Sequence, residues 1–225
     1  MQTPRWLREN WLQAVILALP FIVLAAFWGR FPDRVVVQWN DSGPSKWAGK
    51  FPGLLVCPVL SVALALVFGW IPRLDPKLRR HPEWSERTVG VIRLATTALL
   101  SAGSLLICAE ALGHRVNMPA LSLNAVLLIF LVLGNYMGTF RPSYFIGVRT
   151  PWTLANDDVW RATHRNAGRI MVAGALVFLG LQFFLRGEIL MRGFLAFVGV
   201  SFAWSCLYSY RLSRTLKATA PPPGP

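Results

Sequence analysis

The sequence predicts an all-α integral membrane protein with six transmembrane helices, a short extracytoplasmic β-like loop and a structured cytoplasmic loop. Hydrophobic residues make up 54% of the 225 residues and the mean hydropathy is +0.46, which is more apolar than a soluble domain. These residues gather in runs close to the roughly 20 that a helix needs to cross a bilayer. The basic residues behind the formal net charge of +13 lie between the runs and form no single block. We therefore expect anionic lipid headgroups as their partners and no direct nucleic-acid binding.

Six apolar runs are the candidate transmembrane helices. They cover residues 11–28, 54–71, 89–112, 121–137, 167–185 and 189–210. Arg5 and Arg8 precede the first run, as in a signal peptide, but the run is longer than the about 7–15 residues of a signal core, so an uncleaved helix is expected. Only three residues separate the last two runs. That spacing predicts a tight helical hairpin in which Arg186 and Arg192 snorkel to the interface.

The distribution of Lys and Arg predicts the orientation. With the N-terminus inside, the inner segments hold 14 of these residues and the outer loops hold seven. The positive-inside rule then places both termini in the cytoplasm, the polar stretch 141–168 on the cytoplasmic side and the loop 30–50 outside. Residues 218–225 are rich in proline and are expected to form a disordered tail.

No pattern of residues points to a metal, a disulfide or catalysis. Cys57, Cys108 and Cys206 each lie in an apolar run without a CxxC pair, so buried thiols are expected. The three histidines lie in separate segments, which gives a metal site little support. HExxH and GxSxG motifs are lacking, and the adjacent Asp157 and Asp158 suit a helix start better than catalysis. We expect no cofactor and no enzyme activity.

Local rules predict how the polar stretch 141–168 folds. Pro142 and Pro151 disfavour helix just before them, so residues 140–152 should be irregular or extended. Asn156 is a good N-cap, and the two aspartates after it then lie in the first turn, where the helix dipole favours negative charge. A helix should therefore start near residue 157 and continue into the fifth apolar run unless Gly168 breaks it.

Charged and aromatic side chains on this helix are first interpreted as membrane contacts. A basic stripe with a period of four is favoured as a headgroup anchor over a dedicated ligand site; it consists of Arg161, Arg165 and Arg169. Asp157 precedes Arg161 by four residues, the favourable order for an ion pair. Trp152 and Trp160 are interpreted as interface anchors, and His164 as a packed hydrogen-bonding residue.

A fixed cytoplasmic cap is the more specific interpretation of the same stretch. Its core would consist of Arg149, Trp152, Trp160 and His164. The guanidinium of Arg149 would hold backbone carbonyls or a carboxylate of Asp157 or Asp158, in a planar fork that Lys cannot copy. The two tryptophans would supply the apolar surface, and His164 would add a hydrogen bond inside the cap.

The same stretch carries a resemblance. Gly134 and Gly138 form a small-xxx-small pattern at the end of the fourth run. From there, "GNYMGTFRPSYFIGVRTPWTLANDDVWRATHRNAGR" resembles the signature of the SdpI family, bacterial membrane proteins named for immunity to a secreted killing peptide. The resemblance implies a four-helix module over residues 73–217 with a cytoplasmic loop at 139–166. Its candidate functional residues are Asn135, Tyr136, Arg141, Arg149, Thr150, Trp152, Trp160, Thr163 and His164.

The outer loop 30–50 belongs to a predicted two-helix N-terminal domain, residues 1–72. Three valines at 35–37 precede a turn-rich segment, which predicts a short strand or hairpin. The loop is similar to a small membrane domain of unknown function that often precedes the SdpI module. Its candidate residues are Pro32, Gln38, Trp39, Asn40, Gly43 and Lys50. That domain usually has His where this chain has Gln38. A structured connector and a binding surface are equally open for the loop.

Two functions stay open, with an enzyme ranked last. The resemblance implies a non-enzymatic immunity or resistance protein of the bacterial cytoplasmic (inner) membrane. Its partners would be a membrane-active peptide toxin and a cytoplasmic repressor captured at the membrane. The alternative is a transporter for a small solute or ion, with a path lined by Gln13, Arg93, Glu110, Asn124 and Gln182. Arg93 and Glu110 lie near span ends, where snorkelling suffices, so transport ranks second. A homo-oligomer is left open.

Overall fold

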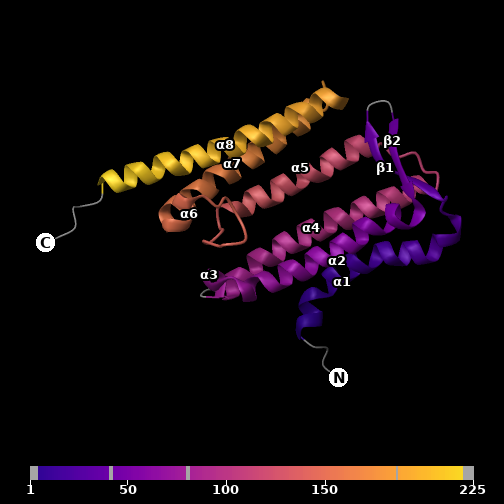
Figure 1. Ribbon diagram of the computed structural model, residues 1–225, viewed down its shortest axis with the longest axis horizontal. Coiled ribbons are helices and arrows are strands. Elements are labelled where there is room, and N and C mark those ends of the chain that lie inside the picture. The colour runs from indigo at the N-terminus through magenta and orange to yellow at the C-terminus, as the bar shows by residue number, and fades with distance from the viewer. Residues whose placement is uncertain (1–4, 41–42, 80–81, 186, 220–225) are drawn as a thin grey trace. The chain divides into compact units, whose positions relative to one another are not determined.

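Most of the described residues lie in helices, and a β-hairpin lies near the start of the chain (Figure 1). The computed structural model describes residues 5–40, 43–79, 82–185 and 187–219. The elements are α1 (Arg5–Phe27), η1 (Trp28–Arg30), β1 (Arg34–Asn40), β2 (Gly43–Gly49), α2 (Lys50–Leu74), α3 (Pro76–Arg79), α4 (Pro82–Ala111), α5 (Met118–Met137), α6 (Pro151–Ala155), α7 (Asp157–Leu181) and α8 (Gly187–Thr219).

The elements form two compact units, each described by itself here. Unit 1 consists of Met1–Trp70 and Val89–Ile129, and unit 2 consists of Ile71–Thr88 and Phe130–Pro225. Helices α2, α4 and α5 contribute to both. The division of the sequence into modules at residues 72 and 73 stays a prediction.

Unit 1 contains the hairpin and an apolar cluster against it. β1 and β2 pair antiparallel, with register shifts on either side of Gln38. The β-branched start of β1 suits a pleated, half-buried strand. Its Val35 packs into a buried cluster with Leu24, Phe31, Leu54 and Cys108. The predicted β-like segment is therefore present as a two-stranded hairpin.

Unit 2 is organised around α7. Helices α7 and α8 run antiparallel and side by side (Figure 1). The end of α5 contacts α7 backbone to backbone, because a Cβ placed on Gly168 would overlap the carbonyl oxygen of Gly134. The predicted close helix contact is thus confirmed at Gly134, whereas Gly138 lies against the side chain of Arg165.

Five helices in the described residues are long and apolar enough to cross a membrane, where the sequence predicted six. They cover Trp11–Arg30, Lys50–Leu74, Thr88–Ala111, Met118–Met137 and Gly187–Leu216. The predicted run 167–185 lies in α7, which ends at Leu181 and continues as turns. The apolar part of α7, residues 170–181, extends roughly 18 Å at 1.5 Å per residue, against about 30 Å for a hydrocarbon core. A multi-pass helical membrane protein is confirmed, and the sixth span stays a prediction.

The start of α7 follows the local rules. The side-chain oxygen of Asn156 accepts the backbone N–H of Asp158 at 2.7 Å and of Val159 at 3.2 Å. The predicted N-cap is therefore confirmed, and the helix continues through Gly168 without a break.

Two details of the sequence prediction were wrong. Helix α6 already begins at Pro151, inside the stretch expected to be irregular, because Pro suits the first turn and Thr150 caps it. Arg161 pairs with Asp158 at 2.6 Å, three residues away, and this printed ion pair replaces the expected one with Asp157. Helix α8 runs to Thr219, and residues 220–225 of the predicted tail lie outside the described residues. Arg186 lies outside the described residues.

Candidate functional site

The segment of residues 139–164, called the cap below, folds around Trp160 of α7. Trp160 has no exposed surface, and its Nε1 donates to the carbonyl oxygen of Phe140 at 2.8 Å. Phe140 and Val148 are buried as well. An indole that is fully buried and hydrogen-bonded anchors a fold. The interpretation of Trp160 as an interface anchor was therefore wrong, and the tryptophan belongs to the interior of the cap.

His164 closes the interior of the cap with both ring nitrogens. Its Nε2 accepts the backbone N–H of Val148 at 2.9 Å, so the proton of the neutral ring is on Nδ1, 2.9 Å from the carbonyl oxygen of Trp160. The ring stacks on Trp160 with a centroid distance of 4.0 Å. Burial lowers the pKa of His164 to about 4, although the bond to the Trp160 carbonyl acts in the opposite direction.

The geometry makes His164 the packed hydrogen-bonding residue that the sequence predicted. Neither ring nitrogen is left for a metal or for proton transfer. Within the described ranges, no group of three or more His, Cys, Asp or Glu side chains could hold a metal ion.

Gly147 allows the loop to pass this close to the histidine. Its φ is +110°, which side-chain-bearing residues rarely adopt, and a Cβ there would overlap Nε2 of His164. The same Cβ would lie 3.1 Å from the ring of Trp160. The "FIGVRT" motif therefore needs glycine for both backbone conformation and space.

Asp75, between α2 and α3, is a buried carboxylate that sequence reasoning missed. Its side chain accepts the hydroxyl of Ser143 at 2.7 Å, the backbone N–H of Tyr144 at 2.8 Å and the backbone N–H of Lys77 at 2.9 Å. The hydroxyl oxygen of Ser143 in turn accepts the N–H groups of the two residues after Tyr144. Asp75 thus fixes the start of the cap loop. The sequence contained a feature that could have pointed to this residue, because Asp75 is the single acidic residue in the basic segment "RLDPKLRR".

Lys77 makes a second connection between α3 and the cap. Its Nζ donates to the carbonyl oxygen of Leu154 in α6 at 3.0 Å and lies 5.0 Å from the centre of the Tyr144 ring. Together with Asp75, it ties the cap to the segment that follows α2.

Arg149 holds the cap loop through a backbone carbonyl. Its Nη1 donates to the carbonyl oxygen of Tyr144 at 2.7 Å, and the side chain is exposed. Of the two kinds of partner expected from the sequence, the structure shows the carbonyl. The side chains of Asp157 and Asp158 are also exposed, and Asp158 pairs with Arg161.

Short α6 joins the cap to α8. Thr150 and Thr153 form a reciprocal capping box, and the hydroxyl of Thr150 lies 3.1 Å from that of Ser209. Trp152 is half-buried and packs edge-on against Tyr210, with ring centres 5.0 Å apart. Both predicted residues, Thr150 and Trp152, therefore contact α8.

The remaining motif residues divide between interior and surface. Thr163 is fully buried, and its hydroxyl has no hydrogen-bond partner in the described part of the chain. Tyr136 is half-buried, and Asn135 and Arg141 are exposed.

The basic stripe of α7 lies on the surface, since Arg161, Arg165 and Arg169 are all exposed. The hydrogen bond and the charge of Asp158 raise the pKa of Arg161. An exposed stripe of this kind suits headgroup contact.

The hairpin of unit 1 is the second candidate region. Trp39 donates from Nε1 to a carboxylate oxygen of Glu110 in α4 at 2.8 Å, which fixes β1 to the end of that helix. Lys50 donates its backbone N–H to Asp33 and places its Nζ 4.9 Å from the centre of the Trp28 ring. Of the other predicted loop residues, Pro32, Gln38 and Asn40 are exposed and Gly43 is half-buried with a φ of +112°.

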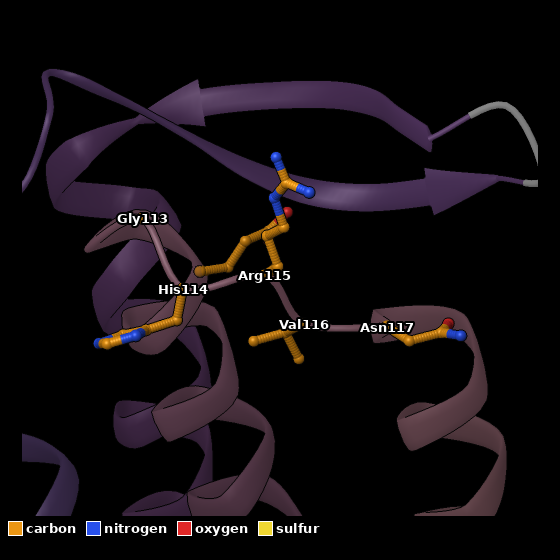
Figure 2. Close-up of a pocket in the computed structure, with 6 residues that line it drawn as sticks. Gly113, His114, Arg115, Val116 and Asn117 are labelled. Atoms are coloured by element: carbon orange, nitrogen blue, oxygen red, sulfur yellow. The ribbon is translucent and has the colours of Figure 1, made fainter.

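An open depression of about 570 Å³ lies beside the hairpin, lined by Glu110 and the five residues from Gly113 to Asn117. Figure 2 shows Arg115 pointing toward the hairpin, while His114 and Asn117 point away from one another. Acidic, basic and amide groups therefore share this end of unit 1.

Of the five residues expected to line a transport path, four lie in unit 1 and Gln182 lies in unit 2. In unit 1, Gln13 bonds Thr97 inside the helices, and Glu110 bonds Trp39 at the hairpin. Arg93 and Asn124 are half-buried. Gln182 follows α7 in unit 2 and donates its backbone N–H to Phe178.

Two segments of the chain match known families. Residues 139–209 match the SdpI/YfhL protein family, and residues 15–62 match a domain of unknown function, DUF1648. The first segment contains the cap, α7 and most of α8. The second contains most of α1, the whole hairpin and the first half of α2. Both predicted resemblances are confirmed.

The chain is also similar to a named protein along nearly its whole length. It is 24% identical over 213 residues to the immunity protein SdpI of Bacillus subtilis (strain 168), which covers 95% of this chain and 100% of that protein. No solved structure matches the chain.

Proposed function

We propose, from the SdpI resemblance, that this chain protects a bacterial cell against a membrane-active peptide toxin as a multi-pass protein of the cytoplasmic membrane. The observation that carries the proposal is the similarity to an immunity protein over 95% of this chain and all of that relative. The similarity covers both the hairpin and the cap, so it is not limited to one pair of transmembrane helices.

The role that we propose is non-enzymatic. The two buried titratable groups of the cap region, Asp75 and His164, are held by hydrogen bonds to backbone and hydroxyl groups. Groups used in this way stabilise a loop and are not poised to attack or protonate a substrate.

We assign the hairpin as the surface that meets the toxin from outside the cell. Its Trp47 is 54% exposed, and Phe51 at the start of α2 is more exposed still. Lys46 and Lys50 lie beside them in the sequence. Exposed aromatic and basic side chains at the ends of apolar helices suit the headgroup region, where a membrane-active peptide also lies.

The orientation in this proposal places both termini in the cytoplasm, which requires an even number of spans. We therefore propose that α7 crosses the bilayer together with α8 as a tight hairpin. Phe183 and Phe184, each 84% exposed in the turn after α7, would extend its short apolar part into the lipid. A C-terminal tag should then be reached by protease only in permeabilised cells. Five spans would put the tag outside.

The cap would face the cytoplasm in the same orientation, as would the basic stripe of α7. The family resemblance implies a cytoplasmic repressor as a further partner, and the exposed side of the cap is the surface available to it. A repressor that co-purifies with the chain in detergent would support this part of the proposal. A repressor that stays soluble in the presence of the chain would remove it without affecting the immunity assignment.

Expression of the chain in a susceptible bacterium tests the proposed function. Tolerance to the killing peptide against which SdpI-type proteins protect should rise, relative to an empty vector, at a verified abundance in the membrane. An unchanged killing curve, together with solute uptake by proteoliposomes that contain the purified chain, would favour the transport alternative.

A further inference from the structure

The interior of unit 1 contains polar side chains where a membrane helix bundle usually buries apolar ones. On α4, Thr97, Ser101 and Ser104 follow one another at spacings of four and three, which places them on one helix face. All three are buried. We call these residues, together with Gln13 of α1 and Ser61 of α2, the polar row.

Hydrogen bonds within the polar row are partly loose. The side-chain nitrogen of Gln13 donates to the hydroxyl of Thr97 at 2.7 Å. The hydroxyl of Ser61 lies 3.3 Å from the carbonyl oxygen of Thr97 and 3.4 Å from the hydroxyl of Ser101. Hydrogen bonds between oxygen atoms are usually about 2.7–2.8 Å long, so the protein holds the Ser61 hydroxyl weakly.

One atom of the polar row has no hydrogen-bond partner in the described part of the protein, and a second has only a weak one. The first is Oε1 of Gln13, a residue that is 8% exposed. The second is Oγ of Ser104, which is 1% exposed and whose partner is the thiol of Cys108. The amide of Gln13 is fixed by Thr97, so its free oxygen lies beside the same row. A buried polar atom without a partner costs about 1–3 kcal/mol in a protein. The cost is higher inside a bilayer, where no solvent compensates.

We propose that the polar row binds ordered water inside the membrane-spanning part of unit 1. Buried water occupies polar sites with two to four partners, and the row offers the Gln13 oxygen and the hydroxyls of Ser61, Ser101 and Ser104. No side chain in the row is charged, which favours a neutral ligand over an ion. A dry contact between small residues explains a close helix approach but leaves the unpartnered oxygen of Gln13 unexplained.

The length of the polar row limits what the water does. From Thr97 to Ser104 the row covers roughly 10 Å of helix, about a third of a hydrocarbon core. The row is therefore a binding site for water and not a complete path across the membrane.

Radiolytic hydroxyl-radical labelling tests the inference, because the radicals form from the bound water itself. The full chain in lipid nanodiscs would carry Ser101→Cys, with Ser104→Cys as a second probe in case the first variant elutes as an aggregate. Two references are matched to it. Leu24→Cys places a cysteine in the buried apolar cluster, eleven residues from Gln13 along α1, and Ala102→Cys replaces an exposed residue on the neighbouring face of α4. The probe cysteine should be oxidised several-fold faster than both references. A probe rate equal to that of the Leu24→Cys reference would overturn the proposal.

Gln13→Leu in the Ser101→Cys background identifies where the water is held. The leucine removes the free amide oxygen and fills its place with methyl groups. Labelling of the probe should fall to the rate of the Leu24→Cys reference, while the rate of that reference and the elution volume stay unchanged. Undiminished labelling of the probe would refute the assignment of Gln13 as a ligand of the water.

Discussion

Replacement of Gly168 by alanine should push α5 and α7 apart. A Cβ at residue 168 would overlap the carbonyl oxygen of Gly134 and lie 3.1 Å from Cβ of Met137. The overlapped atom belongs to the backbone of a helix, so it cannot rotate away as the end of a flexible side chain could. One helix must move relative to the other, and the contacts around the crossing point must loosen.

The expected magnitude follows from two opposing effects. Alanine is favoured over glycine in a helix by about 1 kcal/mol, and overpacking in a close-packed interior costs about 1–3 kcal/mol. Since a backbone atom is overlapped, we expect the upper part of that cost and a net loss of about 1–2 kcal/mol in the free energy of unfolding. Gly180→Ala in the same helix is the matched control, because no neighbouring atom lies within 4 Å of its Cβ position. That variant should be neutral or more stable than wild type.

Denaturant unfolding in detergent micelles, followed by tryptophan fluorescence, measures both variants against wild type. Opposite signs for the two substitutions are the predicted result. A Gly168→Ala protein as stable as Gly180→Ala would refute the close contact between α5 and α7.

Four further outcomes are expected. Gly147→Ala should lower the midpoint of thermal unfolding more than Gly113→Ala does. Both glycines have positive φ, but only a Cβ on Gly147 meets neighbouring atoms. Equal decreases of the midpoint in the two variants would exclude the overlap. A fall from pH 7 to pH 5 should lower the stability of wild type by about 2 kcal/mol relative to His164→Asn. The reason is that unfolded His164 binds a proton near pH 6.5, whereas the folded residue binds one only near pH 4. The contribution of His164 to the free energy of unfolding is therefore full above pH 6.5 and is lost as the pH falls toward 4. A difference in stability between the two proteins that does not change with pH would contradict the buried neutral ring. Asp75→Asn should lower the free energy of unfolding by about 1–3 kcal/mol, because an NH₂ donor replaces one of the two carboxylate oxygens and then faces N–H or hydroxyl donors. The loosened loop should be cleaved faster at residues 140–150 in limited proteolysis. Cleavage at the wild-type rate would count against the role of Asp75. Arg149→Lys should reduce toxin tolerance nearly as much as Arg149→Ala at equal membrane abundance, because Nη1 of Arg149 bonds the Tyr144 carbonyl and the shorter-reaching, tetrahedral ammonium of Lys does not reproduce the guanidinium. Full activity of the lysine variant would reduce Arg149 to a headgroup contact.

Local and periodic features of the fold could be predicted from the sequence. The apolar runs predicted the long helices, the three valines of β1 predicted the hairpin, and Asn156 predicted the start of α7. Each of these depends on neighbours within a few residues, where helix periods, β-branching and capping are strong signals.

Features that depend on distant partners could not be predicted. Asp75 finds Ser143 and Tyr144 across 68 and 69 residues, and no local rule brings these segments together. The sequence left Trp160 open between an interface anchor and the core of the cap, because a tryptophan near a membrane helix is common in either setting and only tertiary packing distinguishes them. The length of α7 was overestimated because a hydrophobic run shows where apolar residues continue and not where the helix ends.

The sidedness of the hairpin and the cap is the point on which both functional assignments depend, since the toxin arrives from outside and a repressor from inside. Single cysteines at the exposed positions Ser45 and Ala155, in a chain in which Cys57, Cys108 and Cys206 are replaced by serine, would be treated with a membrane-impermeant maleimide. We predict that Ser45→Cys is labelled in intact cells and that Ala155→Cys is labelled only after permeabilisation. Labelling of Ala155→Cys in intact cells, with Ser45→Cys protected, would contradict the orientation and, with it, the assignment of the hairpin to the toxin.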